Sequence, residues 1–492
     1  MQNGTLLAAV DLGSNSFRLE IGRFEHGHIH KVEYLKETVR QGNGLDDNRN
    51  LTQDALERGW ACLARFAERL AGFPREHVRA VATQTLREAR NRDDFLTRGS
   101  EVLGYPIDVV SGIEEARLIY QGVARLLPQS DERRLVVDIG GRSTELILGE
   151  QFSPQSVASF RVGSVAWSSR YFADGAFTPQ AFLAAEIAAK AVLDEALAVF
   201  RRDAWDVAYG SSGTAGAVGD VLTAMGGPKG LITRSGLEAL RDKLLRAQSA
   251  DRVRMDGLKE DRRAVIGGGI SVLRAVFDLL EIDEMQVAQG ALRQGALYDL
   301  LDREQPETDL RSSTVNALML RFAVDVPHAE RVAETACTLF LQAAQPDSER
   351  AARKLEWAAK LHEVGCRISH SDYHRHGAYI LDNTDAAGFA LPELHRLGVL
   401  VLGQRGKVRK LEADLSDSTF ALQLLCLRLA VALCHARRAP DISGIRLQAK
   451  PGVFTLTAPL SWSKTYPQSA HLLQEEVTAW QKTPWDLHIA SD

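Results

Sequence analysis

The sequence predicts an α/β protein of two related units, followed by a mainly helical C-terminal part. An apolar run over residues 6–10 ends at Asp11 before a turn of small residues, and a second run over 135–137 ends in the same way at Asp138. Short apolar runs that end in glycine-containing turns are typical of buried strands, and helical spacing between them indicates an α/β order. Beyond Leu301 the strand signals become sparse and helical spacing takes over.

The first unit continues with alternating strand and helix signals. Thr52 is a suitable N-cap for a helix that runs to Leu70, because its hydroxyl can accept a hydrogen bond from a backbone N–H of the first turn. A second helix is predicted over 93–103. Strands are predicted over 17–21, 78–83 and 107–110, with a turn at Glu25-His26-Gly27.

The second unit resembles an enlarged copy of the first. Its strands are predicted over 135–138, 146–148 and 207–209, and Thr178-Pro179 begins a helix that we expect to reach about Phe200. A polar stretch with one proline, 302–309, indicates a domain boundary. We expect domains over 1–125, 126–305 and 306–492, with a hairpin around Pro451-Gly452 in the last.

Composition excludes several classes of protein. Of the 492 residues, 45% are hydrophobic and 25% charged, which are the proportions of a folded globular chain. The 59 basic and 64 acidic residues give a net charge of −5, which argues against a protein that coats nucleic acid. Five cysteines without a CxxC pair indicate neither a disulfide framework nor a zinc ribbon. Because there is no apolar run of about 18 residues and no basic start after Met1, we expect a cytoplasmic protein without a membrane span.

Turns of small residues after the predicted strands are suited to phosphate binding. Asp11–Ser16 and Asp138–Glu145 each place a carboxylate at a strand end and glycine and hydroxyl residues after it, so that backbone N–H groups can approach a phosphate. The turn Gly210–Thr214 and the glycine run 267–269 add to this set. Together they predict a cleft between the two related units, lined by phosphate-binding turns.

Asp138 and Glu145 stand at the two ends of the second turn, where their hard carboxylate oxygens could share a magnesium ion with phosphate. The alternative is that Asp138 only accepts hydrogen bonds from the turn and that Glu145 begins an exposed strand.

Two neighbouring acids are candidates for a catalytic base in the helix that begins at Ser111. We expect Glu114 to complement the helix macrodipole. Glu115 could instead point into the cleft and take a proton from an attacking water. Composition does not decide between the two roles.

Six stretches resemble the exopolyphosphatase and guanosine pentaphosphatase (Ppx/GppA) family. They are AVDLGSNSFRL from Ala9, ATQTLREARN from Ala82, VVSGIEEARLIYQGV from Val109, VVDIGGRSTELILG from Val136, GSSGT from Gly210 and GALRQGALYDLL from Gly290. The resemblance covers essentially residues 1–305 and continues more weakly to the C-terminus. It implies the actin-like fold of sugar kinases and Hsp70, with two ribonuclease-H-like domains around a cleft and an HD-like helical domain after them.

The resemblance also implies roles for individual residues. Glu115 falls on the family's catalytic acid, Asp138 and Glu145 fall on its magnesium-associated acids, and we add Asp11 to the metal candidates. The expected ion is Mg²⁺, with K⁺ as a further candidate. The expected phosphate-binding residues are Gly13, Ser14, Asn15, Ser16, Arg87, Gly140, Gly141, Arg142, Ser143, Ser212, Gly213, Thr214 and Arg262.

The C-terminal part carries nine of the 13 histidines. Where an HD domain would have His-Asp this chain has His362-Glu363, and Gly403–Arg405 stands where related sequences have a His-Arg pair. A working HD hydrolase needs its complete ligand set, so we expect a degenerate, metal-free domain used for dimerisation or for extending a polyphosphate channel. His362 and the histidines at 370, 374 and 376 are then expected to be packing and surface residues.

These observations favour a Mg²⁺-dependent exopolyphosphatase, expected to be a homodimer, in which water attacks the terminal phosphoryl group of inorganic polyphosphate. The closest alternative is a guanosine pentaphosphatase that converts pppGpp to ppGpp, and no feature of the sequence separates the two. A kinase on the same fold would need an adenosine pocket near 267–269, and the helix that carries Glu115 disfavours it. A non-catalytic, alarmone-binding regulator would not need Glu115, Asp138 and Glu145 intact.

Arg142 departs from the family pattern, which usually has a third glycine at this position. A guanidinium here could donate two hydrogen bonds to a phosphate, or it could crowd the turn. If it binds phosphate, Arg142→Gly should raise the KM for a polyanionic substrate in steady-state phosphate-release assays. An unchanged KM would reject this role.

Overall fold

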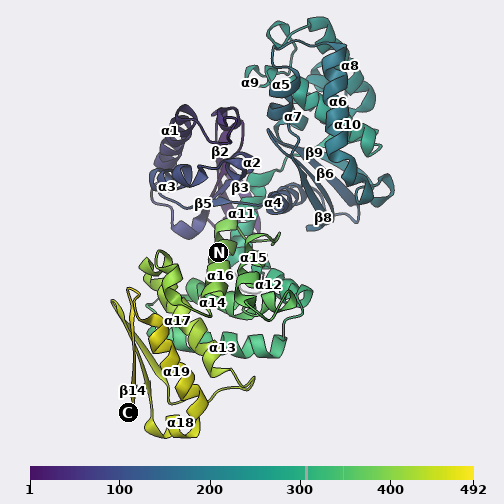
Figure 1. The fold of residues 1–492 in the computed structure, drawn as a ribbon. Helices are drawn as coiled ribbons and strands as arrows, with labels where there is room; N and C mark the ends of the chain where they lie inside the picture. Colours follow the sequence, from purple (N-terminus) through teal and green to yellow (C-terminus); the bar gives the residue numbers. More distant parts are fainter. Residues whose placement is uncertain (305–307, 347, 492) are drawn as a thin grey trace. The chain divides into compact units, whose positions relative to one another are not determined.

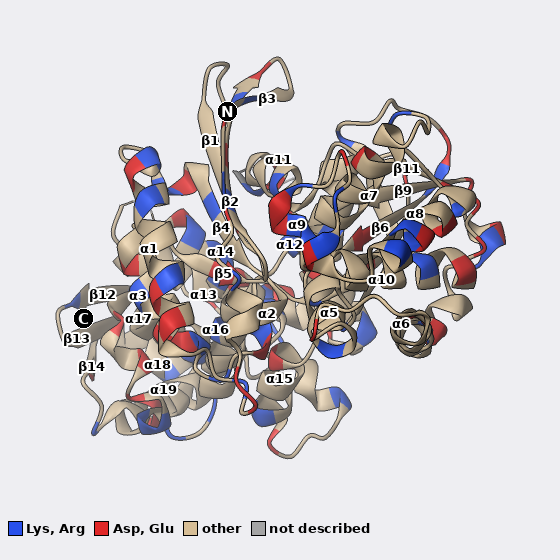
Figure 2. Ribbon diagram, turned by 90° about the horizontal axis from the view of Figure 1, so that it is seen from above, with Lys and Arg blue, Asp and Glu red and all other residues tan. Residues whose placement is uncertain are grey.

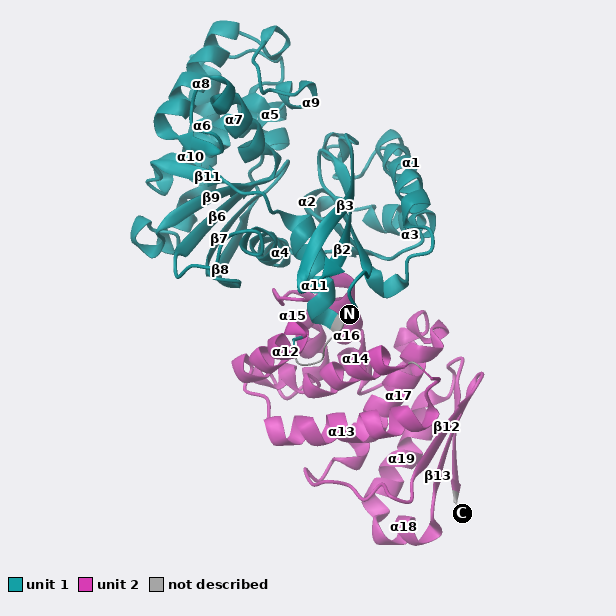
Figure 3. Cartoon of the chain, turned by 180° about the vertical axis from the view of Figure 1, so that it is seen from behind, with its two compact units in different colours: residues 1–308 teal, residues 309–492 magenta. Residues whose placement is uncertain are grey.

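The computed structural model describes residues 1–304, 308–346 and 348–491 (Figure 1). Basic and acidic residues are interspersed along its helices (Figure 2), in keeping with the small net charge. The chain divides into two compact units, 1–308 and 309–492 (Figure 3). The predicted border at 305/306 lies outside the described residues. No helix of the described part combines the length and hydropathy needed to cross a bilayer.

The strands of unit 1 form two sheets of the same design. They are β1 (Leu6–Leu12), β2 (Phe17–Glu25), β3 (His28–Glu37), β4 (Val78–Ala82), β5 (Ile107–Val109), β6 (Arg133–Ile139), β7 (Thr144–Glu150), β8 (Ser153–Phe160), β9 (Val207–Ser211), β10 (Leu231–Thr233) and β11 (Glu284–Val287). The first sheet has the order β3-β2-β1-β4-β5, and the second repeats it as β8-β7-β6-β9-β11 with β10 at the edge. In both, the first three strands pair antiparallel and the next two pairings are parallel. The repeat confirms the predicted pair of related α/β units.

Helices connect these strands. They are α1 (Gln53–Leu70), α2 (Gln84–Glu88), α3 (Arg92–Leu103), α4 (Gly112–Ala124), α5 (Ser164–Tyr171), α6 (Pro179–Leu193), α7 (Ser212–Ala224), α8 (Arg234–Ala247), α9 (Glu260–Arg263), α10 (Ile266–Leu279) and α11 (Leu292–Glu304). Four of them, α1, α3, α4 and α6, lie where the sequence predicts a helix. Thr52 caps α1 as expected, since its Oγ1 accepts a hydrogen bond from the N–H of Ala55. Helix α6 begins after Thr178 as predicted but ends earlier than Phe200, because the chain tightens into a 3₁₀ turn over Asp194–Ala198.

Helices α4 and α11 interlock the two sheets. Helix α4 follows the first sheet in the sequence, yet it shares a buried cluster with Val136 and Ile147 of the second sheet. Helix α11 follows the second sheet and packs on Leu7 of β1. The two helices lie so close together that a Cβ at Gly122 would collide with the carbonyl of Ala291, the residue just before α11. Each sheet is therefore covered by a helix from the other half of unit 1.

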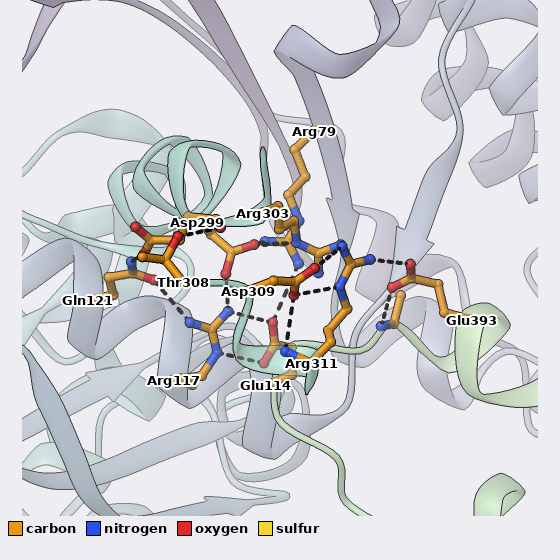
Figure 4. A network of polar contacts seen from close by, with 12 residues as sticks. Arg79, Glu114, Arg117, Gln121, Asp299, Arg303, Thr308, Asp309, Arg311 and Glu393 are labelled. Atoms are coloured by element: carbon orange, nitrogen blue, oxygen red, sulfur yellow. Dashed lines mark hydrogen bonds and ion pairs between the residues drawn. The ribbon is translucent and has the colours of Figure 1, made fainter. Parts of the chain in front are cut away.

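A buried ion-pair network fastens these two helices to the first sheet (Figure 4). Asp299 of α11 accepts hydrogen bonds from Arg79 of β4, Arg117 of α4 and Arg303. Arg117 also donates two hydrogen bonds of 2.8 Å to Glu114. Although burial acts in the opposite direction, the arginines hold the pKa of Asp299 well below its usual range. Glu114, for which the sequence predicts a macrodipole role, is fully buried in this network.

Unit 2 is mainly helical, as predicted. Its elements are α12 (Leu310–Arg321), α13 (Val326–Ala343), α14 (Glu349–Lys360), α15 (Tyr373–Asp382), α16 (Leu391–Gly403), α17 (Ser418–Leu433), β12 (Arg446–Lys450), β13 (Val453–Ala458), α18 (Leu460–Thr465), α19 (Pro467–Trp480) and β14 (Asp486–Ser491). Helix α17 is buried along most of its length and forms the centre of the core. Strands β12 and β13 form the predicted hairpin, whose turn needs Gly452 at φ 77°. Strand β14 pairs parallel to β13 and was not predicted.

Asp299→Asn should destabilise unit 1 by about 3 to 5 kcal/mol, because it leaves buried guanidinium groups without their charge partner. Calorimetric unfolding would measure the loss. Asp302→Asn, one helical turn further along α11, is the matched control: burial outweighs the charge of Arg125 and raises the pKa of Asp302, so neutralising this acid should cost much less stability. Equal losses in the two variants would contradict the assigned role of the network.

Candidate active site

The two turns predicted to bind phosphate meet at one cavity of unit 1. Gly13–Ser16 follows β1 and Gly140–Ser143 follows β6, and both turns line the cavity except at Arg142. Gly141 permits their approach, because a Cβ there would lie only 2.9 Å from the Cβ of Ser14. The predicted site residues that line this cavity are Asp11, Gly13, Ser14, Asn15, Ser16, Glu115, Asp138, Gly140, Gly141, Ser143, Ser212 and Arg262.

The aspartates at the two strand ends face different partners. The register of β1 with β2 places Asp11 opposite Arg18, whereas the register of β6 with β7 places Asp138 opposite Glu145. Side chains at facing positions of antiparallel strands lie on the same side of the sheet. Asp11 binds Arg18 at 3.3 Å and Arg293 at 3.4 Å. The first aspartate is therefore neutralised by arginines, while the second faces another acid.

Burial and mutual repulsion raise the pKa values of the acids around Asp138. Burial, followed by the charge of Glu115, raises the pKa of Asp138 to about 7, although hydrogen bonds with Ser211 and Ser212 act in the opposite direction. Burial and the charges of Glu115 and Asp138 raise the pKa of Glu145 well above its usual value. Buried acids that repel one another in this way favour the approach of a cation.

Glu115, at the start of α4, lines the cavity, in contrast to its neighbour Glu114. The Nη1 of Arg87 donates a hydrogen bond of 2.7 Å to Glu115 and one of 2.8 Å to the carbonyl of Val110, while Nη2 binds Gln84. Burial raises the pKa of Glu115, and the charge of Arg87 lowers it. Arg87, predicted to bind phosphate, does not line the cavity and instead orients Glu115.

Several polar groups at the cavity have no partner in the described structure. Asn15 Nδ2 and Ser16 Oγ are buried and make no hydrogen bond. A buried polar group left in this way costs about 1 to 3 kcal/mol, which a phosphate oxygen would recover. Arg262 forms no salt bridge with any described carboxylate, and burial followed by the charge of Arg18 lowers its pKa. Both observations favour an anion in the cavity.

Arg142 has a protein partner rather than a place in the cavity wall. Its guanidinium donates hydrogen bonds of 3.0 and 2.8 Å to one oxygen of Glu88 and one of 3.2 Å to the carbonyl of Gly42. The side chain thus joins the turn after β6 to α2 and to the segment before α1. Arg142 could make the predicted contact with phosphate only if its guanidinium broke the hydrogen bonds to Glu88.

The third predicted turn is the N-terminus of helix α7, and only Ser212 of it lines the cavity. Thr214 donates a hydrogen bond of 2.9 Å to the carbonyl of Ile139, and Gly213 leaves room for the guanidinium of Arg262. The prediction that the glycine run 267–269 forms a phosphate-binding turn is wrong. It lies buried inside α10, where Gly268 packs against α5 at Ser164 and Ser168.

The sequence did not indicate Arg18 and Arg293 as site residues, although both line the cavity. The signal for Arg18 was its position seven residues after Asp11, the same spacing that separates Asp138 from Glu145. Glu145 does not line the cavity, and its Oε1 accepts a hydrogen bond of 2.8 Å from Ser159, although it lies opposite Asp138 on the neighbouring strand. Because Asp11 is paired with these two arginines, Asp138 and Glu145 remain the metal candidates.

Comparison with known proteins identifies the family. The model of the Ppx/GppA phosphatase family matches residues 21–304, and the model of Ppx/GppA phosphatase domain III matches residues 310–477. The chain belongs to the Ppx/GppA phosphatase family. This confirms the expected actin-like fold with its helical C-terminal domain and the expected class of enzyme, a phosphoanhydride hydrolase.

Full-length relatives and a solved structure agree with this assignment. A guanosine-5′-triphosphate,3′-diphosphate pyrophosphatase of Vibrio atlanticus is 39% identical over 98% of each chain. One of Aeromonas hydrophila is 36% identical over 99% of each chain. An exopolyphosphatase from Cytophaga hutchinsonii matches 61% of this chain and 98% of its own with a TM-score of 0.55, and at 24% identity it shows the shared fold.

The raised pKa of Asp138 predicts how stability depends on pH. Because folding raises this pKa from 3.8 to about 7, the contribution of Asp138 to stability is full below pH 4 and is lost, by at most about 4 kcal/mol, as the pH rises through 7. Asp138→Asn should therefore unfold at a higher temperature than the wild type at pH 8 in EDTA, with a smaller difference at pH 5. Asp11→Asn should instead lower the unfolding temperature, because it removes the charge that Arg18 pairs with and one of the two carboxylates that Arg293 pairs with. Destabilisation by Asp138→Asn at pH 8 would contradict the account.

Proposed function

We propose that this enzyme hydrolyses the 5′ γ-phosphate of pppGpp to give ppGpp and orthophosphate. The observation that carries the proposal is the identity of 36 to 39% over nearly the whole chain with relatives named guanosine-5′-triphosphate,3′-diphosphate pyrophosphatases. The sequence alone favoured an exopolyphosphatase, and these relatives favour its alternative. The cavity supports either reading, because its free donors suit the phosphate chain that both substrates share.

Glu115 is the general base of the proposed reaction. It lines the cavity, and its pKa is raised by burial, which strengthens it as a proton acceptor once ionised. The oxygen of a water attacks the γ-phosphorus while Glu115 takes the proton of that water. The bond from the γ-phosphorus to the bridging oxygen breaks, and the β-phosphate leaves with the electron pair. Arg87 positions the carboxylate of Glu115, and its charge favours the ionised form and so lowers the pKa of this acid against the effect of burial.

The transferred phosphoryl group is held by donors of the two turns. Asn15 Nδ2 and Ser16 Oγ lack protein partners, and Ser143 and Ser212 bring further hydroxyl groups to the cavity. Arg262 adds a positive charge that forms no salt bridge with any described carboxylate, although Asp261 lies near enough to raise its pKa. Donors that are in place before the reaction stabilise the charge of the transition state without further rearrangement.

Asp138 and Glu145 would hold a Mg²⁺ ion, with water and substrate oxygens as its other ligands. Their raised pKa values support this part of the proposal, because a cation favours the ionised form of both acids. When bound, the ion neutralises charge on the phosphate oxygens.

Phosphate release by the wild type and by Glu115→Gln, from pppGpp and from long-chain polyphosphate in parallel, tests the proposal. We expect a higher kcat/KM for pppGpp and a loss of about 10²- to 10⁴-fold in kcat for the variant, since a positioned general base contributes about that much. Glu101→Gln, at an exposed position of α3, is the control and should keep full activity.

Each part of the proposal can fail separately. A higher kcat/KM for polyphosphate would overturn the substrate assignment and leave the assignment of Glu115 intact. Full activity of Glu115→Gln would overturn the assignment of the base.

A further inference from the structure

Three side chains of metal-binding types meet inside unit 2. His328 lies in the first turn of α13, and His362 and Glu363 follow the end of α14. One ligand atom from each lies within 4.8 Å of the other two, and no other His, Cys, Asp and Glu residues in the described part of the chain form such a group. The sequence assigned His362 to packing and did not indicate His328.

The hydrogen bonding of His362 fixes which of its ring nitrogens is free. Its Nδ1 lies 2.7 Å from the carbonyl oxygen of Ala359, and because a carbonyl can only accept, Nδ1 carries the hydrogen. The neutral ring therefore presents the lone pair of Nε2. A backbone carbonyl that orients an imidazole in this way is a usual partner of metal-binding histidines.

Both histidines are buried beside each other, with 5.5 Å between the ring centroids. His362 is 1% exposed and His328 is 5% exposed. His328 Nδ1 is buried without a hydrogen-bond partner. An unpaired ring nitrogen beside a second imidazole and a carboxylate is an unused ligand atom.

A half-exposed arginine, Arg437, lies beside this group. Arg437 donates hydrogen bonds of 2.8 Å to Glu363 and of 2.9 Å to Asp325, so that its guanidinium bridges the two carboxylates. The Arg437 side chain is 49% exposed, whereas that of Glu363 is 15% exposed. The arginine can therefore turn into solvent, while the acid stays.

We propose that His328, His362 and Glu363 form a binding site for a divalent first-row transition metal, and that Arg437 takes the place of the metal's charge until the ion binds. Two imidazoles and one carboxylate leave open coordination positions, and this ligand set suits Zn²⁺ and its neighbours better than Mg²⁺. The site revises the expectation of a metal-free C-terminal domain, and it does not depend on the proposed substrate.

Zinc binding to the full-length protein tests the site, with the zinc content measured after dialysis against Zn²⁺ and excess Mg²⁺. We expect the wild type to hold one equivalent of zinc more than His328→Ala and Glu363→Gln. The difference between the proteins reports this site alone, because zinc bound at any other site contributes equally to all of them. His471→Ala, at an exposed position of α19, is the control and should match the wild type. Equal zinc contents in the wild type and both site variants would overturn the proposal.

Arg437→Ala tests the site in the opposite direction, because tighter binding is expected and a folding defect would only weaken it. Removing the competing guanidinium should tighten Zn²⁺ binding about tenfold, equivalent to about 1.4 kcal/mol, in a competition titration with a chromogenic chelator. Arg438→Ala, the exposed neighbour, is the matched control and should leave the affinity unchanged. Unchanged or weaker binding by Arg437→Ala would contradict the role of the arginine as a substitute cation.

Discussion

The pairing of Asp138 with Glu145 across β6 and β7 is the constraint on which the site depends. Two buried acids on one side of a sheet repel each other, and Glu115 adds a third charge. The first sheet has no such repulsion at the equivalent position, because Arg18 lies opposite Asp11 and pairs with it. The two copies of the repeated α/β unit thus differ at this strand end: one aspartate is paired with arginines and the other faces an acid. The charge of Asp11 is balanced by protein side chains, whereas Asp138 and Glu145 are suited to bind a cation and, through that cation, phosphate.

The packing of α4 and α11 places Glu115 beside these acids. Helix α4 is covered by the second sheet and fixed to the first through Arg117, Asp299 and Arg79. Glu114 forms an ion pair with Arg117 in this network, and the following residue, Glu115, lines the cavity. Of these two adjacent acids, Glu114 therefore stabilises the fold and Glu115 is available for catalysis. The packing of α4 determines the position of Glu115.

Local patterns in the sequence predicted the strands that carry the two turns, the repeat and most of the cavity wall, because strand ends and small-residue turns are set by neighbouring residues. They did not predict β3, β8, β10 and β11. They did not predict which partner each charged group meets. The binding of Arg142 to Glu88 and of Arg87 to Glu115 joins segments that are distant in the sequence, and so does the meeting of His328 with His362. The glycine run 267–269 misled for a related reason, since a glycine needed for close helix packing has the same local appearance as one needed for a turn. The strand β14 is short and pairs with a strand far back in the sequence, which leaves no local signal either.

Burial and the charge of Glu115 hold Asp138 partly protonated until a cation binds. Calorimetric titration of the protein with Mg²⁺ at pH 7, repeated in buffers of different ionisation enthalpy, counts the protons that binding releases. With a pKa of about 7 for Asp138, the account predicts the release of about half a proton or more per ion, and less release as the pH rises to 9. Binding heats that do not depend on the buffer, or a net uptake of protons, would contradict it.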